Sequence, residues 1–215
     1  MKKLKFIFLF VLLAGIAACS SDDDNKEVPA PSGSGSFTYD GKTYNIKSGI
    51  VDNEGIYWSD DGSTEYEFSL ITSKLSIDPI QGFVPEEEKI SVINFNLFSQ
   101  NASKPKTGEY NLDWWNNVDY TVEEASVVIN LSYTFQDGDL VDFDYDEDVE
   151  AESGKVNIHK SGNVYELDFD FTMENGKQLT GEFKGKMLSI EFEEVRPAGK
   201  GFFQALKAKL KELRK

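Results

Sequence analysis

The stretch KVNIHKSGNVYELDFDF, from Lys155 to Phe171, decides the fold class of this chain. On both sides of Ser161-Gly162, apolar residues alternate with polar ones, which is the period of a strand with one buried face. A two-residue turn at Ser161-Gly162 pairs Ile158 with Tyr165 and brings the apolar side chains of both strands to the same face. We therefore predict a β-hairpin that packs one face against a core.

Three further segments show the same alternation. Phe37 to Ile46 surrounds Asp40-Gly41, a dipeptide typical of a type I′ turn, and such a turn pairs Phe37 with Tyr44. Tyr66 to Leu70 and Val127 to Phe135 alternate without interruption. We expect each of these segments to bury one face.

The lengths of the loops can be predicted from the buried faces, because a slip of one residue in register turns the apolar side chains of a strand to the opposite face. Around Asp137-Gly138, a loop of three residues, 137–139, is needed to pair Tyr133 with Phe143, so we predict a bulged turn there. A three-residue turn is favoured near Asn175-Gly176 for the same reason. The apolar phase also shifts at two other points, which we interpret as β-bulges: Val92-Ile93 and Met187-Leu188.

Hairpins in series, with turn signals at short spacing, indicate an all-β fold. We predict one domain over residues 37–195, an antiparallel β-sandwich or flattened β-barrel of about ten strands. Parallel pairing is not expected, because no helical pattern lies between the strands to form a crossover.

The chain ends in a segment of helical period. Pro197 and the glycines after it interrupt the last strand, and residues 196–215 then predict a short basic amphipathic α-helix. Its apolar stripe consists of Phe203, Leu206, Leu210 and Leu213. We expect this stripe to dock on an open end of the β domain, with a membrane surface or a partner protein as the alternative.

The N-terminus predicts export. Lysines at the start are followed by an apolar run from Phe6 to Ala18, which is shorter than the roughly 20 residues a membrane-spanning helix needs. We interpret residues 1–18 as a signal peptide. Ile16-Ala-Ala-Cys19 resembles the lipobox of bacterial lipoproteins, which implies cleavage before Cys19 and lipidation of its thiol. Residues 19–36, rich in Asp, Ser and Gly, then predict a flexible tether.

The net charge of the chain is −16 at pH 7. A field of this sign repels phosphate backbones, so we do not expect nucleic-acid binding by the β domain. Cys19 is the only cysteine, and its lipidation would leave no thiol for a disulfide or a thiolate metal site.

The order of features resembles a broad group of uncharacterised bacterial surface lipoproteins. The resemblance is carried by the lipobox, the acidic tether, the hairpin Phe37 to Tyr44, the strand Gly154 to Ile158 and the segment Thr180 to Gly185. It implies a palmitate-bearing lipid anchor at Cys19, attachment to the cell outer membrane with exposure at the surface, and an all-β domain with no assigned reaction. The strongly basic C-terminal segment departs from this pattern.

One loop is a candidate binding site. Trp114, Trp115, Asn116 and Asn117 follow the alternating Tyr110 and Leu112. If Trp114 continues the inward phase, Trp115 faces solvent beside amide side chains, which suits stacking on a sugar ring with hydrogen bonds to hydroxyl groups. Packing of both indoles at the rim of the core is the alternative.

Three aspartates form a candidate metal site. Asp142, Asp144 and Asp146 alternate along one strand and could hold a hard cation such as calcium. The pattern departs from the EF-hand loop, with Glu147 at the position of the turn glycine. Strand alternation alone accounts for the same residues, with Val141, Phe143 and Tyr145 inward and the aspartates outward. No other cofactor is predicted.

Catalysis has little support in the sequence. His159 is the only histidine and is expected on the polar strand face, so Ser-His-Asp and Cys-His arrangements lack a partner. We therefore expect no enzyme, but a lipoprotein whose β domain binds a glycan, a peptide or an envelope protein. The alternatives are a carboxylate-dependent hydrolase of the glycoside hydrolase type, and an interaction protein acting through its basic helix. The oligomeric state is left open.

Overall fold

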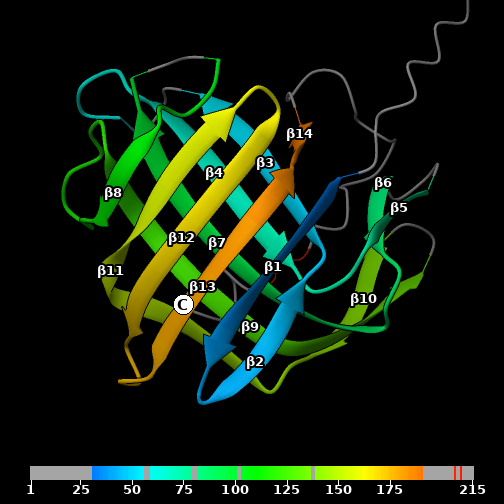
Figure 1. Cartoon of the computed structure of the whole chain (residues 1–215). Helices are drawn as coiled ribbons and strands as arrows, with labels where there is room; N and C mark the ends of the chain where they lie inside the picture. Colours follow the sequence, from blue (N-terminus) through cyan, green and yellow to red (C-terminus); the bar gives the residue numbers. More distant parts are fainter. Residues whose placement is uncertain are drawn as a thin grey trace, which may run out of the picture.

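The computed structural model describes residues 31–55, 59–78, 82–100, 103–136 and 139–190, together with Leu206 and Lys209. Its regular elements are β-strands, and most of them belong to one strongly curled sheet that forms a half-barrel (Figure 1). The predicted signal peptide and Cys19 lie outside the described residues.

The half-barrel consists of twelve hydrogen-bonded strands. The strands of the chain are β1 (Ser32–Tyr39), β2 (Lys42–Ile46), β3 (Ser48–Gly55), β4 (Thr64–Ile71), β5 (Leu75–Asp78), β6 (Gly82–Pro85), β7 (Lys89–Ser99), β8 (Gly108–Leu112), β9 (Thr121–Gln136), β10 (Asp139–Asp144), β11 (Glu147–Ser161), β12 (Val164–Met173), β13 (Gln178–Lys186) and β14 (Leu188–Ile190). Their order in the sheet is β14-β3-β4-β7-β9-β8-β11-β12-β13-β1-β2, β10 pairs with β9, and β5 and β6 form a separate two-stranded sheet.

The predicted all-β fold is confirmed, whereas the strand directions differ from the prediction. Two pairs of strands are parallel, β8 with β9 and β14 with β3. No crossover helix is needed, because the intervening strands connect β3 with β14, and residues 113–120 connect β8 with β9. The result is one curled sheet of mixed direction, and not two packed antiparallel sheets.

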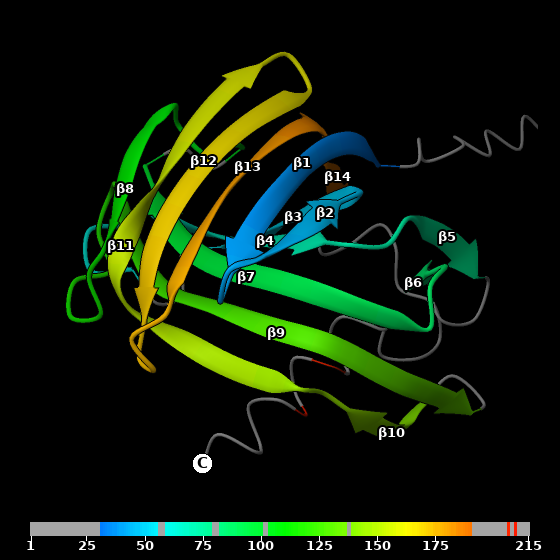
Figure 2. The ribbon, with the colours of Figure 1, turned by 60° about the horizontal axis from the view of Figure 1, so that its bottom comes forward.

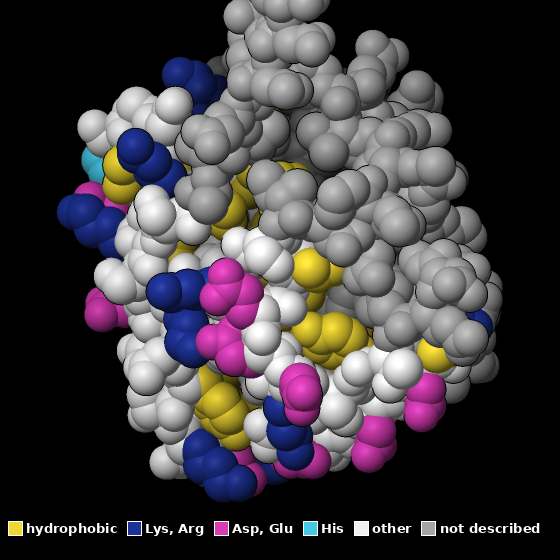
Figure 3. Space-filling model, turned by 90° about the vertical axis from the view of Figure 1, so that its right-hand side faces the viewer, with side chains coloured by type: hydrophobic (Ala, Val, Ile, Leu, Met, Phe, Trp, Pro, Cys, Tyr) yellow, Lys and Arg dark blue, Asp and Glu magenta, His cyan; other side chains and the backbone are white. Residues whose placement is uncertain are grey.

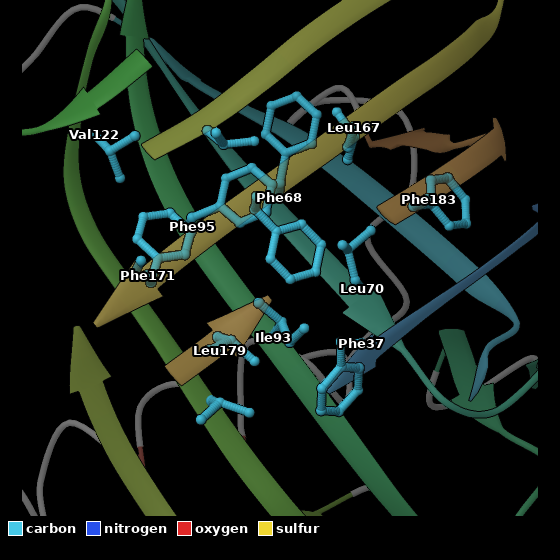
Figure 4. Close-up of a cluster of buried hydrophobic side chains, with 14 of the residues drawn as sticks. Phe37, Phe68, Leu70, Ile93, Phe95, Val122, Leu167, Phe171, Leu179 and Phe183 are labelled. Carbon is cyan, nitrogen blue, oxygen red and sulfur yellow. The ribbon is translucent and has the colours of Figure 1, made fainter. Parts of the chain in front are cut away.

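The inside of the half-barrel holds the larger of two hydrophobic clusters. Alternate residues of β4 and β12 point into it, as the sequence predicts, and Figure 4 shows Phe68 and Phe95 facing Leu167 and Phe171 across the interior. Phe68 and Phe95 stack with their ring centroids 5.1 Å apart. Burying one such side chain contributes about 1.5–3 kcal/mol, so this cluster is the main source of stability.

A second cluster covers the outer face of β3, β4, β7 and β9, where β5 and β6 also contribute. Val92 belongs to this outer cluster and Ile93 to the inner one. The prediction of a bulge at Val92-Ile93 is therefore wrong. The apolar pattern shifts there because both faces of β7 are buried. Met187 likewise belongs to the inner cluster and Leu188 to the outer one, at the point where β13 ends and β14 begins.

One bulge that the alternation of residues does not predict lies in β9. Ile90 pairs with Leu131 and Val92 with Val128, so Ser91 alone stands opposite two residues of β9. Asn130, one of these two, has a φ of 54°. The uninterrupted face predicted from Val127 to Phe135 is consequently wrong: Val127 and Ile129 enter the inner cluster, and Leu131 enters the outer one.

Beyond this bulge β9 leaves the curled part of the sheet. Figure 2 shows it running on to β10, on the side of the molecule where β5 and β6 lie. The outer cluster fills the space that these elements enclose, with Phe83 from β6 and half-buried Phe143 from β10 among its members. The same sheet thus serves one core on each face.

The turn predictions hold in part. The Asp40-Gly41 turn is confirmed, with positive φ at both residues and Phe37 paired with Tyr44. At the hairpin of β11 and β12, Ser161 pairs with Val164, so the turn is Gly162-Asn163 and Ile158 faces Leu167, where Tyr165 was predicted. The shift is by two residues in register, so the buried face is the predicted one.

Of the two other loop predictions, the one at Asp137-Gly138 needs correction and the three-residue turn near Asn175-Gly176 holds. Tyr133 pairs with Phe143 as predicted, but the register shift lies between Leu140 and Asp142, which makes Val141 the extra residue. Residues 137 and 138 themselves lie outside the described residues. Before β13 three residues, 174–176, connect the strands, and the amide of Met173 donates to the carbonyl of Lys177 at 2.9 Å.

The sheet begins earlier than the predicted tether boundary at residue 36. Ser32 to Ser36 pair with β13, and Gly33 lies opposite Gly185. A Cβ atom on Gly185 would collide with the Cα of Gly33, so the two backbones approach as closely as glycine alone allows. Glycine and serine, which read as linker in the sequence, here permit close strand packing.

Of the predicted C-terminal helix, Leu206 and Lys209 are described, and both have helical backbone conformation. Leu206 is 3% exposed and belongs to the outer cluster, whereas Lys209 is exposed. Phe203, Leu210 and Leu213 lie outside the described residues. No helix within the described ranges is long and apolar enough to cross a bilayer.

Candidate functional site

Exposed aromatic side chains gather in the connection between β8 and β9, residues 113–120, which we call the aromatic loop. Trp115 is 89% exposed, Trp114 42% and Tyr120 38%, and the remaining exposed large hydrophobic side chain among the described residues is Val141. Trp114 therefore does not continue the inward phase of β8. Large aromatic side chains exposed in one loop are candidates for a binding site, because leaving apolar surface in water costs free energy.

The Trp-Trp part of the loop has a defined backbone. The Asp113 carboxylate accepts the Trp115 amide at 3.1 Å through Oδ1 and the side-chain amide of Asn116 at 2.8 Å through Oδ2. These hydrogen bonds lower the pKa of Asp113, with the bond from Asn116 as the largest cause. The charged aspartate thus holds the turn that carries both indoles.

A second loop, residues 59–63 before β4, supports the aromatic loop from the side. The amide of Asp60 donates to the carbonyl of Asn117 at 2.9 Å, and the amide of Asn117 donates to the Asp60 carboxylate at 3.1 Å. This reciprocal pair joins segments that are distant in sequence. The aromatic loop is consequently fixed at both the Asp113 and the Asn117 positions.

Asp61 adds a third tie. Its carboxylate accepts the Asp119 amide at 3.1 Å and the Ser63 amide at 2.9 Å. Hydrogen bonds from Ser63, together with that from the Asp119 amide, hold the pKa of Asp61 well below its ordinary range. The carboxylate therefore stays charged at physiological pH and keeps its bonds to the loop.

Tyr120 closes the loop against the barrel. It has a φ of 65°, and its ring centroid lies 5.2 Å from that of buried Tyr110. Lys106 lies 5.5 Å above the Tyr120 ring and pairs with Asp119 at 2.8 Å. The loop is thus anchored to the core on one side and presents its tryptophans on the other.

This arrangement presents both indoles on a backbone that hydrogen bonds hold in place. Of the predicted binding residues, Trp114 and Trp115 are exposed, whereas the amide nitrogens of Asn116 and Asn117 already donate to Asp113 and Glu123. The indoles are therefore the main contact surface, and the asparagines chiefly shape the loop. A preordered surface loses little conformational entropy on binding.

The three aspartates of the predicted calcium site are not brought together. Asp142 and Asp144 lie on β10, but Asp146 follows it and accepts a hydrogen bond from Asn130 at 2.6 Å. Val141 is 54% exposed, so the inward alternation predicted for it is interrupted by the bulge. Within the described ranges, no three His, Cys, Asp or Glu side chains group as a metal site requires.

Acidic and histidine side chains outside the loop do not converge in a described cleft. His159 is exposed on the polar face, opposite Glu166. Ion pairs and hydrogen bonds lower the pKa of five carboxyl groups below the ordinary value: Asp61, Glu109, Asp113, Glu147 and Glu166.

The sequence reading missed one feature, a pocket at one end of the half-barrel lined in part by Lys104, Lys160 and Lys186. These lysines lie far apart in the sequence, on three different segments. No pattern of spacing indicates such a group, since only the curl of the sheet brings its members together.

No protein-family model, curated protein or solved structure matches this chain.

Proposed function

We propose that this chain is a lipid-anchored lipoprotein of the outer membrane, exposed at the cell surface, whose β domain binds a glycan through the aromatic loop. The anchor is supported by the N-terminal sequence: a short apolar run, small residues and Cys19. The tether would place the domain clear of the lipid surface.

The observation that carries the binding proposal is Trp115, 89% exposed on a loop that hydrogen bonds hold in place. An exposed indole on an ordered backbone can offer its π face to the apolar face of a sugar ring, and tryptophan is enriched among residues that dominate binding energy. A peptide or an envelope protein is the alternative ligand for the same surface.

The proposal contains no chemical step by the protein, and the C-terminal segment has a structural role in it. Leu206 is buried in the outer cluster, which supports docking of the predicted helix, residues 196–215, on the β domain. A stripe docked on the sheet is not available to a membrane or a partner.

A glycan array probed with the purified full-length chain tests the binding proposal. For any glycan that the chain binds on the array, replacing Trp115 by Ala should weaken binding at least tenfold. A contacting tryptophan contributes about 2 kcal/mol, and a tenfold change in affinity corresponds to about 1.4 kcal/mol.

Val141→Ala is the matched control, since Val141 is the exposed large hydrophobic residue that lies outside the aromatic loop. Binding should be unchanged in this variant. An equal loss in both variants, or glycan binding indifferent to Trp115→Ala, would reject the aromatic loop as the site. Binding to a peptide array together with no signal on the glycan array would favour the alternative ligand.

A further inference from the structure

A pocket of about 300 Å³ lies at the end of the half-barrel where β14 and the turn between β11 and β12 are found, at the top of Figure 1. The described residues that line it are Pro31, Val51, Asn53, Tyr66, Ser103, Lys104, Pro105, Lys160, Asn163, Tyr165, Lys186, Met187, Leu188 and Ser189. None of them belongs to the aromatic loop. The pocket is therefore distinct from the proposed glycan site.

The floor of the pocket is the inner cluster itself. Val51, Tyr66, Tyr165 and Met187 line the pocket and are also members of that cluster. Burial raises the pKa of Tyr165 to about 12, so its hydroxyl is neutral at physiological pH. A ligand that enters the pocket thus meets a surface of aromatic and aliphatic side chains.

The rim of the pocket is basic. Lys160 is half-buried; its Nζ donates a hydrogen bond to the Tyr165 hydroxyl at 2.7 Å and lies 4.4 Å from the centroid of that ring. Lys104 and Lys186 line the same pocket. Burial and the nearby charge of Lys104 lower the pKa of Lys160, which is the effect expected of positive charges held together without an anion.

These three lysines differ from half of the lysines of the described structure in their surroundings. Ion pairs with carboxylates hold Lys47, Lys89, Lys106, Lys155, Lys177 and Lys184. Among the described residues, no carboxylate pairs with Lys104, Lys160 or Lys186, and none of the described lining residues is acidic, although the chain contains 38 acidic residues. Figure 3 shows the more usual arrangement, with acidic and basic side chains interspersed over one side of the molecule.

From this combination we infer that the pocket binds a small organic acid with an apolar body. The carboxylate lies against Lys160 at the rim, and the apolar part lies on Tyr66, Tyr165 and Met187 at the floor. A volume at the lower end of the roughly 300–1,000 Å³ of ligand pockets suits a short aliphatic or aromatic acid. The net negative charge of the chain does not oppose this, because salt screens charges beyond about 8 Å while the lysines are in contact with the ligand.

Isothermal titration of the purified full-length chain with octanoate and with 1-octanol tests the inference, because the two probes share an apolar chain and differ in charge. Octanoate should bind at least tenfold more tightly than octanol. Lys160→Met, which keeps the apolar stem and removes the charge, should weaken octanoate binding at least tenfold and leave octanol binding within twofold.

Lys42→Met is the matched control, because Lys42 is exposed, is not among the described residues that line the pocket, and pairs with no carboxylate among the described residues. Octanoate binding should be unchanged in this variant and in Trp115→Ala, which separates the pocket from the glycan site. A thermal unfolding curve of Lys160→Met checks that the variant folds. If it does not fold, the inference is tested with Lys186→Met and with the affinities of the unmodified chain for octanoate and octanol. Equal affinities for octanoate and octanol, equal losses in Lys160→Met and Lys42→Met, or no octanoate binding at millimolar concentration would each overturn the inference.

Discussion

Asn130 shows how much a single residue can determine in this sheet. Its φ of 54° lies in the left-handed region, which asparagine tolerates better than other non-glycine residues. Its amide donates to Ser91 Oγ at 3.0 Å, and its side chain donates to Asp146. The bulge at Asn130 reverses which face of β9 each following side chain points to. Leu131 therefore packs in the outer cluster, while Ile129 stays in the inner one.

Substitution of Asn130 should therefore separate backbone conformation from side-chain bonding. Asn130→Val should lower the free energy of unfolding by about 2 kcal/mol, because a β-branched residue in the left-handed region is strained by roughly 1–2 kcal/mol and the bond to Asp146 is lost. Asn130→Gly loses the bond without the strain and should cost about 1 kcal/mol or less. Urea unfolding measures both. A valine variant as stable as the glycine variant would contradict the role given to the bulge.

At the scale of elements, the end of the half-barrel opposite the pocket is joined by one carboxylate. Glu147, at the start of β11, accepts hydrogen bonds from the Tyr39 hydroxyl of β1 and from Lys177 Nζ before β13, each at 2.8 Å. Lys177 also pairs with Asp40 at 3.2 Å in the turn between β1 and β2. Lys177, followed by Tyr39, lowers the pKa of Glu147 from its ordinary value of 4.5. One charged network thus ties three strand ends together.

The lowered pKa has a defined consequence for stability. Because the folded protein binds the Glu147 proton less readily than the unfolded chain, this contribution is fully present above about pH 5 and is lost as pH falls through the lowered pKa. Glu147→Gln should reduce the free energy of unfolding by about 1 kcal/mol or less at pH 7, a partly exposed pair being screened by solvent. The variant should also show a weaker decrease toward acid pH than the unmodified chain.

Denaturant unfolding at a series of pH values between 3 and 7 measures this effect. Asp168→Asn, which removes an exposed carboxylate of β12 away from the network, is the control and should keep the acid dependence of the unmodified chain. If Glu147→Gln loses stability toward acid as steeply as Asp168→Asn, the network does not contribute as described.

At the scale of the whole molecule, two features are combined: a β domain with a core on each face of one sheet, and an N-terminus that predicts export and lipidation. The net charge of −16 disfavours adsorption of the domain to anionic lipid. In the proposed function, membrane attachment depends on acyl chains at Cys19, of which each buried CH₂ contributes about 0.8 kcal/mol.

Cys19→Ala should accordingly move the protein from the membrane to the soluble fraction when cells are fractionated. Release should be nearly complete, since no second anchor is predicted. Retention of the variant in the membrane fraction would show that the C-terminal segment or another surface holds the protein there. Deletion of residues 200–215 in the same assay distinguishes these two.

Strand positions and buried faces were largely predictable, because alternation reports directly which residues face a core. Val156, Leu167 and Phe171 are buried as the pattern requires. Register was less predictable: the turn at Gly162-Asn163 shifts the pairing by two residues and leaves every face unchanged, so the face argument could not detect it. At the candidate site, the exposure of Trp115 followed from the pattern, but that of Trp114 did not, because β8 ends at Leu112.

The amino-acid sequence by itself determined that the chain forms strands and most of their buried faces, since both follow from local alternation and turn residues. Only the tertiary structure decided that one sheet curls into a half-barrel with a core on each face, that Gly33 meets Gly185, and that three distant lysines surround one pocket. The physical reason is that bulges and long-range pairing set curvature, and a bulge such as that at Asn130 changes the direction of a strand without changing its pattern of residues.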